Sequence, residues 1–295
     1  MTKPINEILP KEIERGLDEL LTNFSKLIDE FVNYGTHILK WIVENPNGSD
    51  EKMPLILFFR DLLEKADSIS LLIDKSSIDP AKIILRSIFE IHLYLDYMIE
   101  KEYTDRSMSF LVWDIMRKIR LLNSFNKDTE QHKQLLTQLN KDKSILGTEI
   151  LENIPDVTNE INNLELLLKR KEYVRAVGEY NRTKEQDKKN PSWYRLFDGP
   201  RNIQELATRQ EMPLLYEVLY RECSGSVHGT DILQGKITPS NIRDLDSDLD
   251  KVYADIIQIR FPKDAQRVTS YCLSLLLKSF RLVVNCRIPE KVEDL

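Results

Sequence analysis

Glycine and proline are scarce in this chain, which has 9 glycines and 12 prolines in 295 residues. Sheet proteins need a turn after most strands, and turns are built largely from these two residues. The scarcity therefore argues against an all-β fold and favours long helices. The residues are 41% hydrophobic and 31% charged, as in a folded protein with a well-solvated surface. We predict an all-α fold, a multi-helix bundle of long helices with a polar helical arm.

Cysteine and histidine are also few, with three cysteines (Cys223, Cys272 and Cys286) and four histidines. The cysteines are odd in number and lack Cys-x-x-Cys spacing, so we expect reduced thiols in the cytoplasm. The scattered histidines and cysteines do not form the ligand spacing of a zinc site. The sequence has no glycine-rich phosphate loop, Gly-x-Ser-x-Gly elbow or His-Glu-x-x-His motif. We expect neither a metal nor another cofactor.

Long apolar runs are missing as well. The most apolar stretches, Leu55–Phe59 and Leu273–Val284, are too short or are interrupted by Lys278 and Arg281, whereas a membrane helix needs about 20 apolar residues. The first ten residues lack the apolar core of a signal peptide. The net charge of −6 argues against a general nucleic-acid coat but is compatible with a local basic cleft. We expect a cytoplasmic protein without membrane contact.

Apolar residues recur at a 4-3 spacing from Leu17 to Ile42, and only Gly35 breaks the pattern. This spacing predicts one apolar stripe along a helix of about 30 residues, a length that suits a bundle or a coiled-coil seam. Asn45–Ser49 has turn chemistry and ends the helix. We therefore predict that segment 1–50 is a long helix that packs in the bundle or forms the seam of a homodimer.

The rest of the chain divides into three further segments. Asp79 and Pro80 form a helix start signal, and the helix that follows is apolar nearly all round, which indicates a buried position. We assign residues 51–127 to core helices. The Lys-, Glu- and Asn-rich segment 128–190 is predicted as a polar helical arm or insertion, and 191–295 as C-terminal helices.

The helix after Pro213 carries Glu217, Arg221, Ser224 and His228 at a 4-3-4 spacing, which places all four on one face. They can form a polar seam in which His228 is an acid or base and Arg221 holds a phosphate. Glu217 and Ser224 would then orient these two side chains. On spacing alone the more common arrangement is a solvated face, with the helix ended by a glycine cap and His228 favoured by the helix dipole.

Arg86 and Glu90 are four residues apart on the helix predicted to be buried. Charged residues are rarely buried unless they are paired. The two form either a structural ion pair or part of the same cleft as Arg221 and His228. His92 lies among aliphatic residues of that helix, and we predict that it is a core histidine.

The stretch 188–197 combines cations with aromatic rings. In RNA-binding proteins, aromatic rings stack on bases while cations hold phosphates. The residues predicted to contact RNA in this way are Lys188, Lys189, Trp193, Tyr194 and Arg195. Alternatively, Trp193 and Phe197 anchor a hinge between helices, because buried aromatic residues dominate packing.

The segment Tyr-Arg-Glu-Cys-Ser-Gly-Ser-Val-His-Gly at 220–229 resembles the Arg-x(4–6)-His signature of the HEPN superfamily. Its setting is similar too, since it lies on a late helix that follows long helices, one of which carries Arg-Ser-Ile-Phe-Glu at 86–90. Together with Gly-Pro-Arg-Asn-Ile-Gln-Glu-Leu-Ala at 199–207, these segments also resemble an uncharacterised bacterial helical family.

The HEPN resemblance implies a helical bundle that often dimerises, so that two Arg/His motifs share one cleft. Many such proteins are metal-independent ribonucleases of toxin–antitoxin, abortive-infection and other antiviral defence systems. By position, Arg221 would stabilise the charge on the reacting phosphate, and His228 would handle the proton of the 2′-hydroxyl or of the leaving group. The implied partners are RNA or a nucleotide, a second copy, and a protein antitoxin or other defence protein.

Two other functions remain open on sequence alone. One is a non-catalytic interaction module in which the stripe Leu17–Ile42 binds a partner or a second copy. The other is a sensor that binds a small nucleotide at the same cleft without cleaving it.

Overall fold

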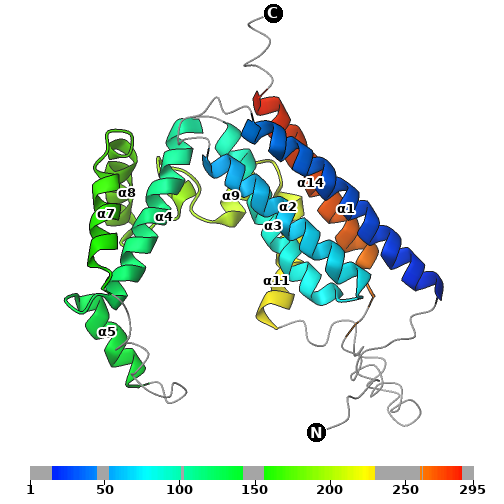
Figure 1. The fold of residues 1–295 in the computed structure, drawn as a ribbon, viewed down its shortest axis with the longest axis horizontal. Coiled ribbons are helices and arrows are strands. Elements are labelled where there is room, and N and C mark those ends of the chain that lie inside the picture. The colour runs from blue at the N-terminus through cyan, green and yellow to red at the C-terminus, as the bar shows by residue number, and fades with distance from the viewer. Residues whose placement is uncertain are drawn as a thin grey trace, which may run out of the picture. The chain divides into compact units, whose positions relative to one another are not determined.

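The computed structural model describes residues 15–44, 53–100, 103–141, 156–229, 260 and 262–287. The chain folds into two compact units, unit 1 with residues 1–101 and 203–295, and unit 2 with residues 102–202. All regular elements in the described ranges are helices (Figure 1), so the predicted all-α class is confirmed. Within these ranges, no helix is both long and apolar enough to span a membrane.

Unit 1 is built on four long helices: α1 (Arg15–Glu44), α2 (Met53–Asp74), α3 (Ile78–Glu100) and α14 (Ala265–Arg287). Each of α1 and α3 packs against both α2 and α14, so the four helices surround one core (Figure 1). Burial of large apolar side chains along all four helices stabilises this bundle. Fully or almost fully buried core residues include Leu21, Ile28, Phe59, Leu62, Leu85, Ile88, Cys272 and Leu276.

The apolar stripe predicted on α1 is used inside unit 1. Leu21, Ile28, Ile38 and Ile42 are buried where α2 and α14 of the same chain pack on α1. This stripe is therefore part of the bundle core and is not free along its length to form a dimer seam. A second set of apolar side chains on α1 points outward: Leu20, Leu27 and Tyr34 are 45%, 40% and 60% exposed.

Gly35, the residue that breaks the stripe, lies where α1 packs closely against α2 and α14. A Cβ atom at this position would collide with Leu63 Cδ2 and would lie 2.9 Å from the Phe280 ring. We expect Gly35→Ala to lower the free energy of unfolding by about 1–3 kcal/mol through overpacking. Urea unfolding measures this change.

Gly178 on α8 provides the matched control, because a Cβ atom there would meet nothing within 4 Å. Gly178→Ala should raise stability by about 0.5–1 kcal/mol through helix propensity alone. A Gly35→Ala protein as stable as the Gly178→Ala protein would contradict the close packing inferred at Gly35.

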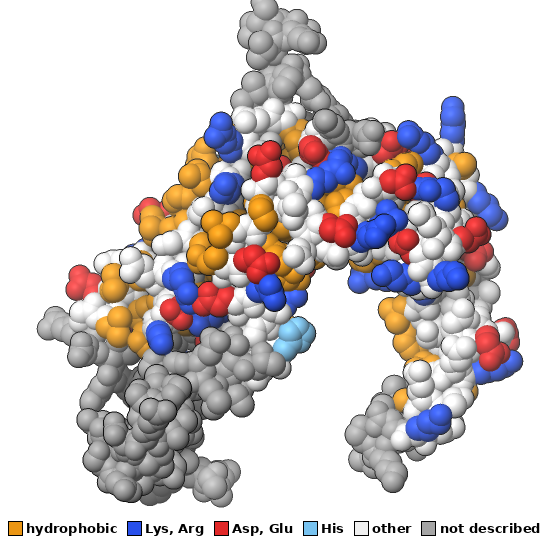
Figure 2. Space-filling view, turned by 180° about the vertical axis from the view of Figure 1, so that it is seen from behind, with side chains coloured by type: hydrophobic (Ala, Val, Ile, Leu, Met, Phe, Trp, Pro, Cys, Tyr) orange, Lys and Arg blue, Asp and Glu red, His pale blue; other side chains and the backbone are white. Residues whose placement is uncertain are grey.

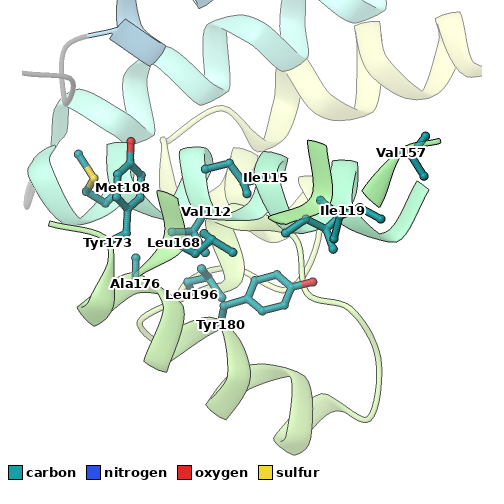
Figure 3. Packing of buried hydrophobic residues seen from close by; sticks show 11 residues of the cluster. Met108, Val112, Ile115, Ile119, Val157, Leu168, Tyr173, Ala176, Tyr180 and Leu196 are labelled. Atoms are coloured by element: carbon teal, nitrogen blue, oxygen red, sulfur yellow. The ribbon is translucent and has the colours of Figure 1, made fainter. Parts of the chain in front are cut away.

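Unit 2 contains α4 (Tyr103–Phe125), α5 (Glu130–Leu139), α7 (Thr158–Leu168), α8 (Val174–Asp187) and the 3-10 turn η3 (Trp193–Arg195). The apolar face of α4 is covered by α7, α8 and η3, so the unit has its own core (Figure 3). The core residues are Met108, Val112, Ile115, Ile119, Val157, Ile161, Leu168, Tyr173, Ala176, Tyr180 and Leu196. The polar segment predicted at 128–190 is thus only part of a larger unit, because α4 supplies the surface on which its helices pack.

Four short elements complete unit 1: α9 (Ile203–Arg209), α10 (Pro213–Leu215), the π-helical turn η4 (Tyr216–Tyr220) and α11 (Arg221–His228). The helix predicted after Pro213 does start there, with proline at a first helical position. It ends at Gly229, whose φ of 65° is left-handed, as expected of a glycine cap. The π-helical turn was not predicted.

Candidate functional site

Arg86 of α3 contacts both the π-helical turn η4 and α11, and so links these two elements to the bundle. Its Nη2 donates a hydrogen bond to Tyr220 Oη over 2.6 Å, and its Nη1 donates to Ser224 Oγ over 3.0 Å. Its Nε lies 3.4 Å from Glu90 Oε1, and the Arg86 side chain is only 18% exposed. These contacts fix the guanidinium in one orientation. We call Arg86, Glu90, Tyr220 and Ser224 the arginine cluster.

Tyr220 links the two charges of this cluster. Burial raises the pKa of Tyr220, and the negative charge of Glu90 raises it further, while Arg86 acts in the opposite direction. The phenol therefore stays protonated, so it can accept from Arg86 and donate to Glu90. A half-buried arginine and carboxylate that are both paired in this way avoid the cost of an uncompensated buried charge.

The π-helical turn also places two tyrosine rings together. Tyr216 stacks on Tyr220 with ring centroids 4.9 Å apart and planes inclined by 20°. The Arg86 guanidinium carbon lies 4.2 Å from the centroid of the Tyr220 ring, which is a cation–π contact. Short π-helical turns inside α-helices occur frequently at functional sites, so this turn marks the segment as a candidate site.

The predicted polar face of the helix divides into two parts. Ser224 points to α3, whereas Arg221 and Glu217 form an exposed pair at 2.8 Å with side chains 65% and 46% exposed. His228 is exposed in the last turn of α11, and no described residue forms a hydrogen bond or ion pair with it. The structure thus brings together Arg86, Glu90 and Ser224, and it places the two predicted catalytic residues on the open side of the same helix.

A family model decides what this chain is related to. The model described as a family of unknown function, DUF5677, matches residues 52–241, more than half of the chain. The chain belongs to this family. The matched range contains the arginine cluster, Arg221 and His228, while α1 and α14 lie outside it. Searches of curated proteins and of solved structures give no match.

In this DUF5677 protein the basic and aromatic stretch 188–197 is largely internal. Trp193, Tyr194 and Arg195 are 3%, 8% and 7% exposed. Trp193 packs edge-on against Phe110, and burial of this kind leaves no ring face on which a base could stack. The burial of these three residues therefore does not fit the predicted contact with RNA. The alternative role of Trp193 as a packing anchor does fit its position.

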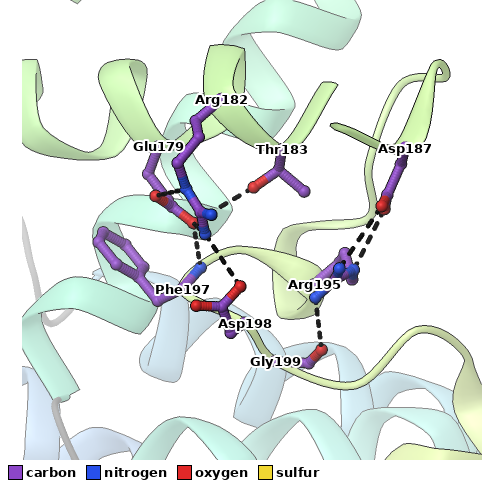
Figure 4. A network of polar contacts seen from close by, with 8 residues as sticks. All are labelled: Glu179, Arg182, Thr183, Asp187, Arg195, Phe197, Asp198 and Gly199. Atoms are coloured by element: carbon purple, nitrogen blue, oxygen red, sulfur yellow. Dashed lines mark hydrogen bonds and ion pairs between the residues drawn. The ribbon is translucent and has the colours of Figure 1, made fainter. Parts of the chain in front are cut away.

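Polar contacts explain why Arg195 is held inside unit 2 (Figure 4). Its Nε lies 3.1 Å from Asp187 Oδ2, and its Nη1 donates to the Gly199 carbonyl over 3.2 Å. Nearby, Arg182 hydrogen-bonds Glu179 and holds the pKa of that carboxyl below its usual value. Of the predicted RNA contacts, only Lys188 and Lys189 are exposed. On the face in Figure 2, basic and acidic side chains are interspersed over both units.

A second polar network in the DUF5677 chain fixes the first turn of α11. Lys82 Nζ lies 3.0 Å from Asp264 Oδ2, and Arg267 reaches both Asp264 at 3.2 Å and Glu222 at 3.1 Å. Burial opposes the charge on Asp264, but Lys82 and Arg267 lower its pKa below the usual value. The alternating charges tie α3, α14 and α11 together next to the arginine cluster.

The remaining histidine and cysteine side chains give no sign of a metal centre. His92 is fully buried, so the prediction of a core histidine is confirmed. Burial raises the pKa of Cys223 to about 11 and that of Cys272 to about 12, which keeps both thiols protonated. Among the described residues, no group of three histidine, cysteine or acidic side chains could hold a metal ion.

Proposed function

We propose that this DUF5677 protein is a metal-independent ribonuclease that uses Arg221 and His228 of α11 to cleave RNA by attack of the 2′-hydroxyl. The observation that carries the proposal is the anchoring of α11 by the half-buried Arg86 through Ser224, one helical turn before His228. A reactive residue works best on an element that is held rigidly by its neighbours. The resemblance of 220–229 to the HEPN signature supports the same assignment.

The proposed reaction needs a cation and a group that can transfer protons. The 2′-oxygen forms a bond to phosphorus while the bond from phosphorus to the 5′-oxygen breaks, which leaves a 2′,3′-cyclic phosphate. The 2′-hydroxyl loses a proton and the leaving 5′-oxygen gains one: His228 transfers one of these protons, and solvent water transfers the other. Glu217 engages one nitrogen of Arg221, and in the proposed reaction the other donors of its guanidinium bind the phosphate.

The spacing of the two residues favours a composite site. Arg221 and His228 are seven residues apart on α11, or about 10 Å along the helix axis. In the homodimer that the HEPN resemblance implies, two copies of the motif share one cleft, which shortens this separation. The proposal places the protein in the cytoplasm, as a toxin or antiviral effector that a protein antitoxin or another defence protein controls.

The test is an RNA-cleavage assay with the full-length protein in the presence of a metal chelator. The double variant Arg221→Ala/His228→Ala should lose cleavage while its circular dichroism spectrum stays that of the wild type. Wild-type cleavage by the folded double variant would rule out this site. Binding of RNA without any product would identify a nucleotide sensor in place of an enzyme.

A self-association module is a second candidate, and it rests on the outer face of α1. Leu20, Leu27 and Tyr34 are exposed and repeat every seven residues, the spacing of helix pairs that pack along a seam. An open groove of about 620 Å³ lies beside this face, between the first turns of α1 and α14. The groove is lined by Leu17, Leu20, Leu21, Phe24, Pro262, Asp264, Ala265, Gln266, Arg267, Ser270 and Tyr271. The proposed occupant is α1 of a second copy.

Charged residues on this face should separate the copies. We expect Leu20→Glu/Leu27→Glu to weaken dimerisation at least about 100-fold, since two buried apolar contacts are lost. Sedimentation velocity over a range of concentrations measures the change. Leu166→Glu on α7, where the leucine is 61% exposed, is the matched control and should sediment as the wild type does. Identical association of all three proteins would reject this surface.

A further inference from the structure

Tyr216 is the outermost member of a stack that also contains Tyr220 and Arg86. Its ring stacks on Tyr220 at 4.9 Å, and Tyr220 is held in turn by the hydrogen bond and the cation–π contact from Arg86. Arg86 is fixed by Glu90 and Ser224. The orientation of the Tyr216 ring is therefore set by residues that reach back into the bundle, and a ligand would meet a ring that is already ordered.

Tyr216 lies in open surroundings next to the exposed ion pair of Arg221 and Glu217. The ring is half-buried, and among the described residues Tyr220 is its one ring partner and its hydroxyl has no hydrogen-bond partner. Leu214, two residues earlier, is 75% exposed. The backbone N–H of Arg221 donates to the Tyr216 carbonyl at the end of the π-helical turn, so the two residues lie on adjacent turns. Glu217 is the main cause of the raised pKa of Arg221, and Tyr216 adds to that shift. An aromatic face thus lies beside an exposed arginine.

We propose that Tyr216 is a stacking platform for one nucleobase of single-stranded RNA, with the adjoining phosphate on Arg221. This inference rests on the proposed function and names the form of its substrate. Stacking on a protein ring requires a base whose face is free, and bases in a duplex are already stacked on each other. A ring and a neighbouring cation are the two elements with which proteins hold single strands.

A structural role and a binding role for Tyr216 predict different effects of its replacement on stability and on ligand affinity. If the ring only supported Tyr220, its loss would change stability and would not depend on whether the ligand carries bases. If the ring binds a base, its loss should weaken the binding only of ligands that carry bases. Tyr216→Phe keeps the ring face and Tyr216→Leu removes it, so the pair separates stacking from the hydroxyl group.

The experiment measures fluorescence anisotropy of a labelled 2′-O-methyl oligonucleotide, which cannot be cleaved through its 2′-oxygen, and of an abasic oligonucleotide of the same length. For the base-containing probe, Tyr216→Leu should weaken binding about 10-fold to 100-fold and Tyr216→Phe by less than about threefold. The wild-type protein should bind the abasic probe as weakly as Tyr216→Leu binds the base-containing one. Leu166→Ala, at an exposed leucine of α7, is the control and should bind both probes as the wild type does.

Equal binding of the base-containing probe by wild type and Tyr216→Leu would overturn the stacking role. If the proposed function holds, the wild type still cleaves RNA in that case, so the two failures are distinguishable. A wild-type protein that neither binds the probe nor cleaves RNA would remove the proposed function and this inference together. Should Tyr216→Leu fail to fold, equal binding of the two probes by the wild type would overturn the stacking role by itself.

Discussion

Replacement of His228 by alanine is expected to lower the rate of RNA cleavage by about 100-fold to 10,000-fold, the usual contribution of a general acid or base. The side chain is exposed, and no described residue bonds to it, so the fold should not depend on it. At most, the loss of a favourable charge at the end of α11 should cost under about 1 kcal/mol of stability. Cleavage kinetics and thermal unfolding of the same sample measure both effects.

His37→Ala is the matched control for this change. His37 is also exposed and lies on α1, outside the family match. That variant should cleave RNA at the wild-type rate. A His228→Ala protein that keeps its rate within about twofold would show that α11 does not supply the proton-transfer group.

The second large effect is a loss of stability in acid through His92. Its Nδ1 lies 2.8 Å from Ser279 Oγ, and that hydroxyl donates its own hydrogen to the Leu275 carbonyl. Nδ1 is therefore the donor, while Nε2 is buried and has no hydrogen-bond partner. Protonation would add a charge and a second N–H group with no acceptor. Burial, helped by the charge of Lys278, lowers the pKa of His92 to about 4 from its usual 6.5.

The direction in which stability changes with pH follows from the difference between the pKa of His92 in the folded and in the unfolded chain. Below pH 6.5 the unfolded chain binds a proton at this histidine, whereas the folded protein resists it until about pH 4. The contribution of His92 is therefore fully present above pH 6.5 and is lost between pH 6.5 and 4. A shift of this size corresponds to about 3 kcal/mol of the free energy of unfolding.

Urea unfolding at pH 7 and at pH 4 tests the effect. The difference in unfolding free energy between the two pH values should be smaller by about 3 kcal/mol in His92→Leu than in the wild type. Leu95→Ala is the control, because it truncates another fully buried residue of α3 that does not titrate. An identical pH dependence in wild type and His92→Leu would contradict a buried, neutral histidine.

Features that depend on local spacing could be predicted from the sequence. The stripe on α1, the buried character of α3, the start at Pro213 and the cap at Gly229 each follow from residues that are close in the chain. The pairing of Arg86 with Glu90 also follows, because residues four apart share a helix face. These predictions need only the geometry of one helix.

The composition of the site could not be predicted in the same way. The 4-3-4 pattern predicted neither the π-helical turn from Tyr216 to Tyr220 nor the contact of Tyr220 and Ser224 with Arg86. Tyr220 was missed because its partner Arg86 is 134 residues away in the chain, although Tyr220 directly precedes Arg221. Arg195 was misjudged because its partners, Asp187 and the Gly199 carbonyl, become partners only after the loop folds. Neither effect leaves a signal in residue spacing.

The most direct measurement of the central claim is the time course of cleavage of a labelled single-stranded RNA by the full-length protein in a metal chelator. A 2′-O-methyl copy of the same strand is incubated in parallel. The predicted result is cleavage of the RNA to fragments with 2′,3′-cyclic phosphate ends and no cleavage of the methylated copy. Cleavage of both strands, cleavage only after Mg²⁺ is added, or no cleavage of either strand would contradict the claim.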